Sequence, residues 1–254
     1  MPDGPRVIPT RLPRPAAPSI SVAAATPTVR AEVADRFLRS RRAAYDPTVV
    51  PAETKAKRLL DLTAVVLSAP IVFPALGLIA LLIRLDSPGP ALFFQRRYGR
   101  GGKKFTLIKF RTMRVDAREA LADHLVANAQ HAFEWAEHRK LKDDPRVTRV
   151  GRFLRRTSLD ELPQLINVWR GEMSLVGPRP LPVCERITYG RAFRTYTQAT
   201  PGLTGLWQVS GRSDLPYAKR IALDTLYVRN RSLRLDLSIL RRTAAAVASA
   251  KGAY

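Results

Sequence analysis

The sequence contains few cysteines and few acidic residues, and both shortages restrict what the protein can be. Cys184 is the single cysteine among 254 residues, which excludes an internal disulfide and a thiolate zinc site, and fits a reducing compartment. The 21 Asp and Glu are outnumbered by 43 Lys and Arg, so the formal net charge is +22 at pH 7. Such a surface favours an anionic partner, and nucleic acid, an anionic bilayer and phosphorylated substrates all qualify.

The first 30 residues lack regular hydrophobic spacing and hold seven prolines. Because this composition buries too little apolar surface to offset chain entropy, residues 1–50 are expected to form a disordered proline-rich tail. No apolar stretch follows the first charges, so a cleaved secretory signal is not expected. The folded domain is predicted to occupy residues 51–254.

One long stretch, residues 62–83, lacks charge entirely. Its 22 residues match the thickness of a bilayer, and a buried helix in a soluble core is the alternative explanation. Pro70 and Pro74 interrupt the middle of the stretch, and each tends to bend a helix because it removes a backbone donor. The sequence therefore predicts a membrane helix that bends at these prolines.

Basic residues flank this stretch on both sides. They are Arg41, Arg42, Lys55, Lys57 and Arg58 upstream, and Arg84, Arg96, Arg97, Arg100, Lys103 and Lys104 downstream. Basic flanks favour the cytoplasmic side of a membrane, so both ends are expected there. A re-entrant helix that enters, bends and returns satisfies both flanks. A proline-kinked span is the remaining alternative, although it places one flank on the wrong side.

Two short apolar and aromatic runs follow the membrane stretch. Residues 91–97 and 104–113 are separated by a glycine-rich turn at 99–102, which is typical of a β-hairpin. Two lysines follow the glycines, but the spacing of a phosphate-binding P-loop is absent. Residues 115–140 are rich in Ala, Glu, Leu and Arg and are predicted to be helical.

Three histidines recur at seven-residue spacing in that predicted helix, at His124, His131 and His138. On one continuous helix this spacing separates neighbours by about 10 Å along the axis, which is too far to share a metal ion. We interpret them as a solvated or packing stripe.

The strongest local signal lies at Asp160 and Glu161. Ser158 and Glu161 match a helix capping box, and on that interpretation residues 164–169 continue a helix that Gly171 ends. Eight basic residues between positions 139 and 156 favour a different interpretation. Positive neighbours and a helix dipole favour the charged form of a carboxyl, so Asp160 is expected to be ionised and able to attack phosphorus. Glu161 is expected to hold a divalent cation that neutralises a pyrophosphate.

From Lys57 onward, roughly four fifths of the chain resembles the bacterial sugar transferases, which are monotopic polyprenyl-phosphate phosphoglycosyl transferases. Six blocks in the right order carry the resemblance: residues 57–61 (KRLLD), 108–113 (IKFRTM), 158–162 (SLDEL), 173–180 (MSLVGPRP), 201–212 (PGLTGLWQVSGR) and 223–227 (LDTLY). The later blocks are most similar to exopolysaccharide enzymes that start with glucose or galactose 1-phosphate. The resemblance does not fix the donor sugar or the glycan pathway.

The resemblance implies a two-step reaction. Asp160 matches the family's nucleophile, which attacks the β-phosphorus of a UDP-sugar, releases UMP and forms a phosphosugar ester that polyprenyl phosphate then accepts. Glu161 matches the ligand of the family's Mg²⁺ ion. The positions that match phosphate or nucleotide contacts are Lys109, Arg155, Arg179 and Arg212, and Asp224 matches an acidic position near the site. Prolines on both sides of Arg179 restrict its backbone and favour a fixed phosphate contact.

The resemblance also implies a fold and a location. We expect a mostly helical α+β protein, with a re-entrant membrane helix and a small β-hairpin, on the cytoplasmic face of the bacterial inner membrane. Pro74 matches the family's helix break, but Phe73 stands where a Ser is usual, so Pro70 and Ser68 are expected to share that role. Anionic inner-membrane lipid is an expected partner, and self-association is left open.

Two other classes of function compete with this interpretation. A membrane-tethered nucleic-acid-binding protein would fit the charge, but no helix-turn-helix, zinc spacing or RNA-binding aromatic motif is present, so no nucleic-acid partner is expected. A non-catalytic scaffold would fit the membrane stretch. The acidic pair and its basic neighbours argue against a scaffold.

Overall fold

The computed structural model describes residues 53–138, 141, 144–211 and 215–248. The predicted tail, residues 1–50, lies outside them. The fold is α+β and mostly helical, as predicted, with a three-stranded and a two-stranded sheet in the described part of the chain. The helices are α2 (Lys55–Asp86), α3 (Ala117–Ala127), α4 (Ala129–His138), α5 (Arg149–Thr157), α6 (Gln164–Trp169), α7 (Arg186–Tyr189), α8 (Ala192–Tyr196), α9 (Tyr217–Asn230) and α10 (Leu233–Ala248).

The predicted hairpin is confirmed. β1 (Leu92–Tyr98) and β2 (Lys104–Phe110) pair antiparallel along their whole lengths, and their turn contains a 3₁₀ segment, η2 (Arg100–Gly102). β2 ends three residues earlier than predicted. Beyond it, the backbone N–H of Arg111 still donates to the carbonyl of Ala91, and the guanidinium donates to the carbonyl oxygens of residues 87 and 88. β4 (Leu181–Pro182) adds a short third strand beside β1, and β3 (Ser174–Val176) pairs parallel with β5 (Gly202–Thr204).

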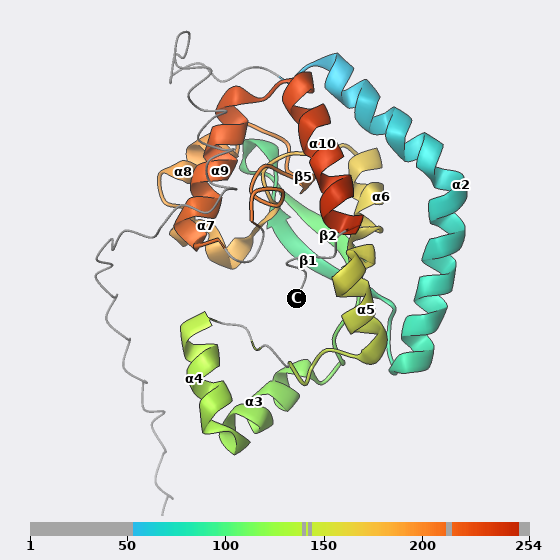
Figure 1. The fold of residues 1–254 in the computed structure, drawn as a ribbon, viewed down its shortest axis with the longest axis vertical. Coiled ribbons are helices and arrows are strands. Elements are labelled where there is room, and N and C mark those ends of the chain that lie inside the picture. The colour runs from blue at the N-terminus through green and yellow to red at the C-terminus, as the bar shows by residue number, and fades with distance from the viewer. Residues whose placement is uncertain (1–52, 139–140, 142–143, 212–214, 249–254) are drawn as a thin grey trace, which may run out of the picture.

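The main hydrophobic core lies between these sheets and the helices α6, α9 and α10 (Figure 1). Val168, Tyr227, Val228 and Ile239 are buried almost completely within it. A second cluster joins the end of α2 to α5 and to the end of β2. These two clusters hold the hairpin, α5 and α6 in fixed positions relative to each other.

Helix α2 is long and mostly exposed. At 1.5 Å per residue its 32 residues extend about 48 Å, and only 11% of its most apolar 18-residue window is buried. Leu67, Ile71 and Phe73 are each at least 67% exposed, which contradicts the alternative of a buried helix in a soluble core. The helix has the length and composition of a membrane segment, although these alone do not fix its topology.

The ends of α2 differ from its middle because both contact the globular part of the protein. Near its start, Lys57 and Asp61 are buried, and near its end Ile79 and Ile83 pack into the second cluster. The most exposed large apolar side chains of the central part lie at residues 66–73. Figure 1 shows α2 curving along one side of the molecule between these two attachments.

Neither Pro70 nor Pro74 ends the helix, because α2 continues through both. The helix is therefore not interrupted at the expected break. Ser68 donates a hydrogen bond to the carbonyl of Val65 at 3.0 Å. Pro70 has no N–H and leaves the carbonyl of Val66 without its helical donor. Ser68 was expected to satisfy such a carbonyl, but it bonds to the carbonyl one residue earlier.

The predicted helical character of residues 115–140 is confirmed in the described residues, but the segment forms two helices instead of one continuous helix. Helix α3 ends at Asn128, which caps it with a backbone hydrogen bond to His124, and α4 begins at the next residue. The turn brings His124 and His131 together, with Nε2 and Nδ1 2.7 Å apart and the two rings stacked. The estimated separation of about 10 Å does not hold, because it assumed a continuous helix. The side chain of His138 lies outside the described residues.

A buried ion pair joins the start of α2 to α10. Lys57 Nζ lies 2.8 Å from Asp236, which also accepts a hydrogen bond from Tyr227. Lys57→Met removes the charge while keeping the length of the side chain, and it leaves the Asp236 carboxylate buried without its cation. We expect a loss of about 3–5 kcal/mol in unfolding free energy, or roughly 10 °C in Tm. Thermal unfolding in detergent checks this, and Lys55→Met, at an exposed position two residues earlier, should unfold like the wild type.

Candidate active site

Asp160 and Glu161 lie in a tight turn between two helices. Helix α5 ends at Ser158, whose φ of 59° is the one positive φ of a non-glycine residue in the described chain. A 3₁₀ turn, η3 (Leu159–Glu161), follows and leads into α6. Ser158 makes no side-chain capping hydrogen bond, so the capping-box interpretation is wrong. An αL serine costs about 1–2 kcal/mol, which is typical of backbone strain kept at a functional site.

Helix α5 is seated tightly against the residues that follow β2. A Cβ built on Gly151 would lie 2.1 Å from the carbonyl oxygen of Thr112, so only glycine fits there. The hydroxyl of Thr112 accepts a hydrogen bond from Arg155 Nε at 2.9 Å. At the start of α5, Asp86 accepts a hydrogen bond from the backbone of Val150. The last turn of α5, which carries Arg155, is therefore fixed beside the acidic turn.

Lys109 reaches the same place from β2. Its ammonium nitrogen lies 5.3 Å from the centre of the Phe93 ring on the neighbouring strand. The free edge of β2 is held by the buried side chain of Asn167, which accepts from the backbone N–H of Ile108 and donates to the carbonyl of Thr106. A residue on a neighbouring parallel strand would make the same two hydrogen bonds. The side chain of Asn167 therefore satisfies the edge of β2 next to Lys109 in place of another strand.

The acidic pair is held among positive charges, and its protonation reflects two opposing effects. Burial raises the pKa of Asp160 above its usual value, while Lys109, Arg155 and Arg179 oppose that increase. Burial also raises the pKa of Glu161, and the adjacent Asp160 raises it further. The positive neighbours of Asp160 favour its charged form, as expected from the sequence. Its burial opposes that form, and burial could not be seen in the sequence.

The two cations closest to the acidic turn show the complementary effect. Burial lowers the pKa of Lys109 and of Arg155, and Asp160 is the largest opposing influence on each. These mutual effects place the predicted Lys109 and Arg155 in one electrostatic cluster with Asp160 and Glu161. Such a cluster can stabilise negative charge that develops on a phosphoryl group.

Arg179 joins the cluster from the loop between β3 and β4. Its flanking residues, Pro178 and Pro180, are buried, while Arg179 itself is exposed. Its guanidinium carbon lies 5.4 Å from the centre of the Trp207 ring. Arg97, which sequence analysis treated only as a basic flank, is buried and donates to the carbonyl oxygen of Pro180 at 2.9 Å. Burial lowers the pKa of Arg97 to about 10.

Asp224 lies under this loop, on helix α9, and is almost completely buried. Burial raises its pKa to about 7, while the Tyr189 hydroxyl, which donates to Asp224 at 2.9 Å, and the backbone N–H of Arg179 oppose the increase. The Tyr189 hydroxyl therefore anchors the buried Asp224 carboxylate. Arg212, the remaining predicted contact, lies outside the described residues.

Comparison with known proteins agrees with this arrangement. Residues 52–250 match the model of the family described as bacterial sugar transferase. The chain belongs to the bacterial sugar transferase family. The Exopolysaccharide production protein ExoY of Rhizobium meliloti is 44% identical over 221 residues, which are 84% of this chain and 98% of that protein.

Two other sugar transferases are similarly close. The UDP-galactose-lipid carrier transferase of Erwinia amylovora is 46% identical over 78% of this chain, which covers 41% of that longer protein. The UDP-glucose:undecaprenyl-phosphate glucose-1-phosphate transferase of Caulobacter vibrioides is 45% identical over 78% of this chain and 72% of that protein. The chain is thus a member of a family of transferases.

The donor atoms of this sugar transferase fit the Mg²⁺ ion that the resemblance implies. Asp160 and Glu161 offer adjacent carboxylates, and Mg²⁺ is usually held by one or two carboxylates together with substrate phosphates. The described residues contain no group of three or more His, Cys, Asp or Glu that could hold a metal ion by itself. Because positive side chains surround the carboxylates, a divalent cation would bind best together with an anionic substrate.

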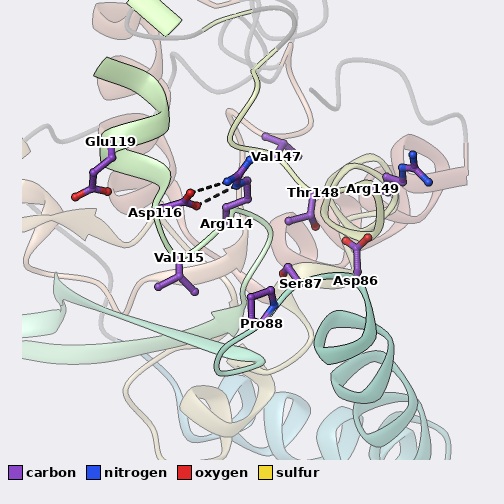
Figure 2. A pocket seen from close by; sticks show the side chains of 10 residues that line it. All are labelled: Asp86, Ser87, Pro88, Arg114, Val115, Asp116, Glu119, Val147, Thr148 and Arg149. Atoms are coloured by element: carbon purple, nitrogen blue, oxygen red, sulfur yellow. Dashed lines mark hydrogen bonds and ion pairs between the residues drawn. The ribbon is translucent and has the colours of Figure 1, made fainter. Parts of the chain in front are cut away.

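A large open groove of about 970 Å³ lies at the opposite end of α5 from the acidic pair (Figure 2). Arg114 and Asp116 form an ion pair in its wall, and Asp86 caps α5 as described above. Three of its charged groups are already engaged, Arg114 with Asp116 and Asp86 with the backbone of Val150, and the described residues that line the groove include no adjacent pair of carboxylates. The candidate active site of the sugar transferase is therefore the acidic turn, and this groove is not part of it.

Proposed function

We propose that this sugar transferase moves a sugar 1-phosphate from a UDP-sugar to a polyprenyl phosphate, and so begins the assembly of an exopolysaccharide. One observation carries the proposal. The acidic pair Asp160 and Glu161 is surrounded by Lys109, Arg155 and Arg179 on a globular body attached to a long apolar helix. The names of the relatives, with their sugar donors and lipid carriers, support the same chemistry.

In the proposed first step, a carboxylate oxygen of Asp160 forms a bond to the β-phosphorus of the donor, and the bond from that phosphorus to the UMP oxygen breaks. In the second step, an oxygen of polyprenyl phosphate attacks the same phosphorus and releases the Asp160 carboxylate. Lys109, Arg155 and Arg179 stabilise the charge on the phosphoryl oxygens in both steps. A magnesium ion at Glu161 would supply further neutralisation of the pyrophosphate.

The attachment of α2 supports a location on one face of the membrane. The two ends of a straight membrane span lie on opposite sides of the bilayer, and a single globular body cannot pack against both. Both ends of α2 pack against one body here, and the basic flanks favour the cytoplasmic side. We therefore propose that α2 is re-entrant, that the protein is monotopic on the cytoplasmic face of the inner membrane, and that anionic lipid contacts it.

Cysteine labelling tests this topology. Single cysteines at Lys55 and Lys103, both exposed, should react with a membrane-impermeant maleimide only after the cytoplasmic face is opened. The exposed Cys184 must first be replaced by serine, so that it does not contribute a signal. Labelling of one of the two positions from outside intact cells would establish a span and contradict the re-entrant helix.

A donor panel tests the reaction itself. Detergent-solubilised protein is incubated with polyprenyl phosphate, magnesium and UDP-glucose, UDP-galactose or UDP-N-acetyl sugars, and UMP is measured. We expect release of UMP with at least one donor, together with a lipid-linked sugar diphosphate product. Release of UMP from none of the donors would contradict the proposed function, and the most active donor would identify the sugar.

A further inference from the structure

Two arginines lie over one buried aromatic ring next to the candidate active site. The guanidinium carbons of Arg179 and Arg220 are 5.4 Å and 5.3 Å from the centre of the Trp207 ring, which is 4% exposed. The face of an indole attracts a cation through its quadrupole. Trp207 therefore fixes the positions of two flexible side chains, one from the loop after β3 and one from the first turn of α9.

The positions of both arginines are further restricted. Arg220 Nε donates to the carbonyl of Leu215 at 2.9 Å, which orients its guanidinium plane. The buried prolines on both sides of Arg179 restrict its backbone. Two guanidinium groups next to one ring place two positive charges in the same region, which favours an anion there. Arginine is also the side chain that best matches two oxygens of a phosphate.

The two arginines act electrostatically on different neighbouring groups. Arg179 acts electrostatically on Asp160 and Glu161, so it lies at the acidic turn. Burial raises the pKa of Tyr217, the first residue of α9, and Arg179 and Arg220 both oppose that increase. Arg179 therefore connects the acidic turn to Arg220.

From this arrangement we infer that Arg220 binds the α-phosphate of the donor, the phosphate that leaves as UMP, and that Trp207 is a positioning residue for both arginines. The inference rests on the proposed function. Attack at the β-phosphorus places the attacking and leaving oxygens roughly in line, so the leaving phosphate lies on the far side of that phosphorus from Asp160. Arg220, beside Arg179 at the Trp207 ring, would supply a positive charge for that phosphate.

The first test measures UMP binding and donor kinetics with the full-length, detergent-solubilised protein. Arg220→Gln should weaken UMP binding and raise the donor KM by about 10- to 100-fold, the loss expected for a charge-assisted phosphate contact. The KM for polyprenyl phosphate should stay unchanged. Arg220→Lys should recover part of the UMP affinity. The matched control is Lys219→Gln, which removes a charge at an exposed neighbouring position on α9 and should behave like the wild type.

The outcomes separate this inference from the proposed function. If the wild type releases UMP and Arg220→Gln binds UMP within twofold of it, Arg220 has no role at the α-phosphate. If Arg220→Gln raises the KM of donor and acceptor equally and lowers Tm, its role is structural. If the wild type neither binds UMP nor releases it from any UDP-sugar, the proposed function fails and this inference fails with it.

A second pair of variants tests Trp207. Trp207→Phe keeps an aromatic face and should retain most of the UMP affinity, whereas Trp207→Leu should lose it. Trp135→Leu is the matched control, because Trp135 lies under a different arginine, Arg146. If Trp207→Leu does not fold, Trp207→Phe decides alone. Loss of UMP binding by a folded Trp207→Phe protein, as well as unchanged binding by Trp207→Leu, would overturn the positioning role.

Discussion

Replacing Asp160 with asparagine is expected to abolish the release of UMP in the absence of the lipid acceptor. The wild type should release up to one equivalent of UMP per enzyme from the donor alone, because the first step leaves the phosphosugar on Asp160. An amide is a poor nucleophile, so Asp160→Asn should lower the overall rate by roughly three orders of magnitude or more. Steady-state kinetics of the wild type should be ping-pong.

Intact-protein mass spectrometry after incubation with donor alone checks this expectation. The wild type should gain the mass of a hexose phosphate, and a peptide map should place it on Asp160. Asp123→Asn, which changes an exposed acidic residue on α3, should keep the burst and the adduct. An adduct on another residue, or a stoichiometric burst from Asp160→Asn, would leave direct transfer between the two bound substrates as the better mechanism.

Removing the divalent cation is expected to have a comparably large effect. Chelation with EDTA should stop the wild-type reaction, and added Mg²⁺ should restore it. Glu161→Gln keeps the size of the side chain but removes its charge, so we expect a loss of roughly 100-fold or more in kcat/KM. The Mg²⁺ concentration that gives half-maximal activity should also rise in this variant.

That Mg²⁺ dependence separates a metal ligand from a residue that only shapes the turn. A structural change at Glu161 would lower Tm and leave the half-maximal Mg²⁺ concentration unaltered. Glu119→Gln, at an exposed site on α3, serves as the control for losing one carboxylate. Full turnover of EDTA-treated wild type would show that the metal role assigned to Glu161 is wrong.

Much of the fold follows from local patterns in the sequence. Two apolar and aromatic runs on either side of a glycine-rich turn predict the hairpin, which the structure confirms with a shorter second strand. The helix over residues 115–140 was predicted with the right type but without its turn at Asn128. That turn is stabilised by one backbone cap and by the stacking of His124 on His131, and neither leaves a clear signal in composition.

The sequence pointed to the residues of the candidate site but not to the residues that surround and support them. The family resemblance pointed to Lys109, Arg155, Asp160 and Glu161, and in the structure these four act on one another electrostatically. Sequence analysis gave no role to Arg97, Asn167, Trp207 and Arg220, which hold or extend that cluster. Trp207 lies within a block that matched the family, so its position in the block was an available signal.

Short-range patterns in the sequence predicted an apolar helix with basic flanks and a hairpin, because these features depend on neighbours within a few residues. The fold was needed to show that both ends of α2 attach to one body and that Ser158 adopts an αL turn. It was also needed to show that burial raises the pKa of Asp160. Burial and electrostatic contact depend on groups far apart in the chain, as Arg155 and Thr112 are, and no local pattern reports such pairs.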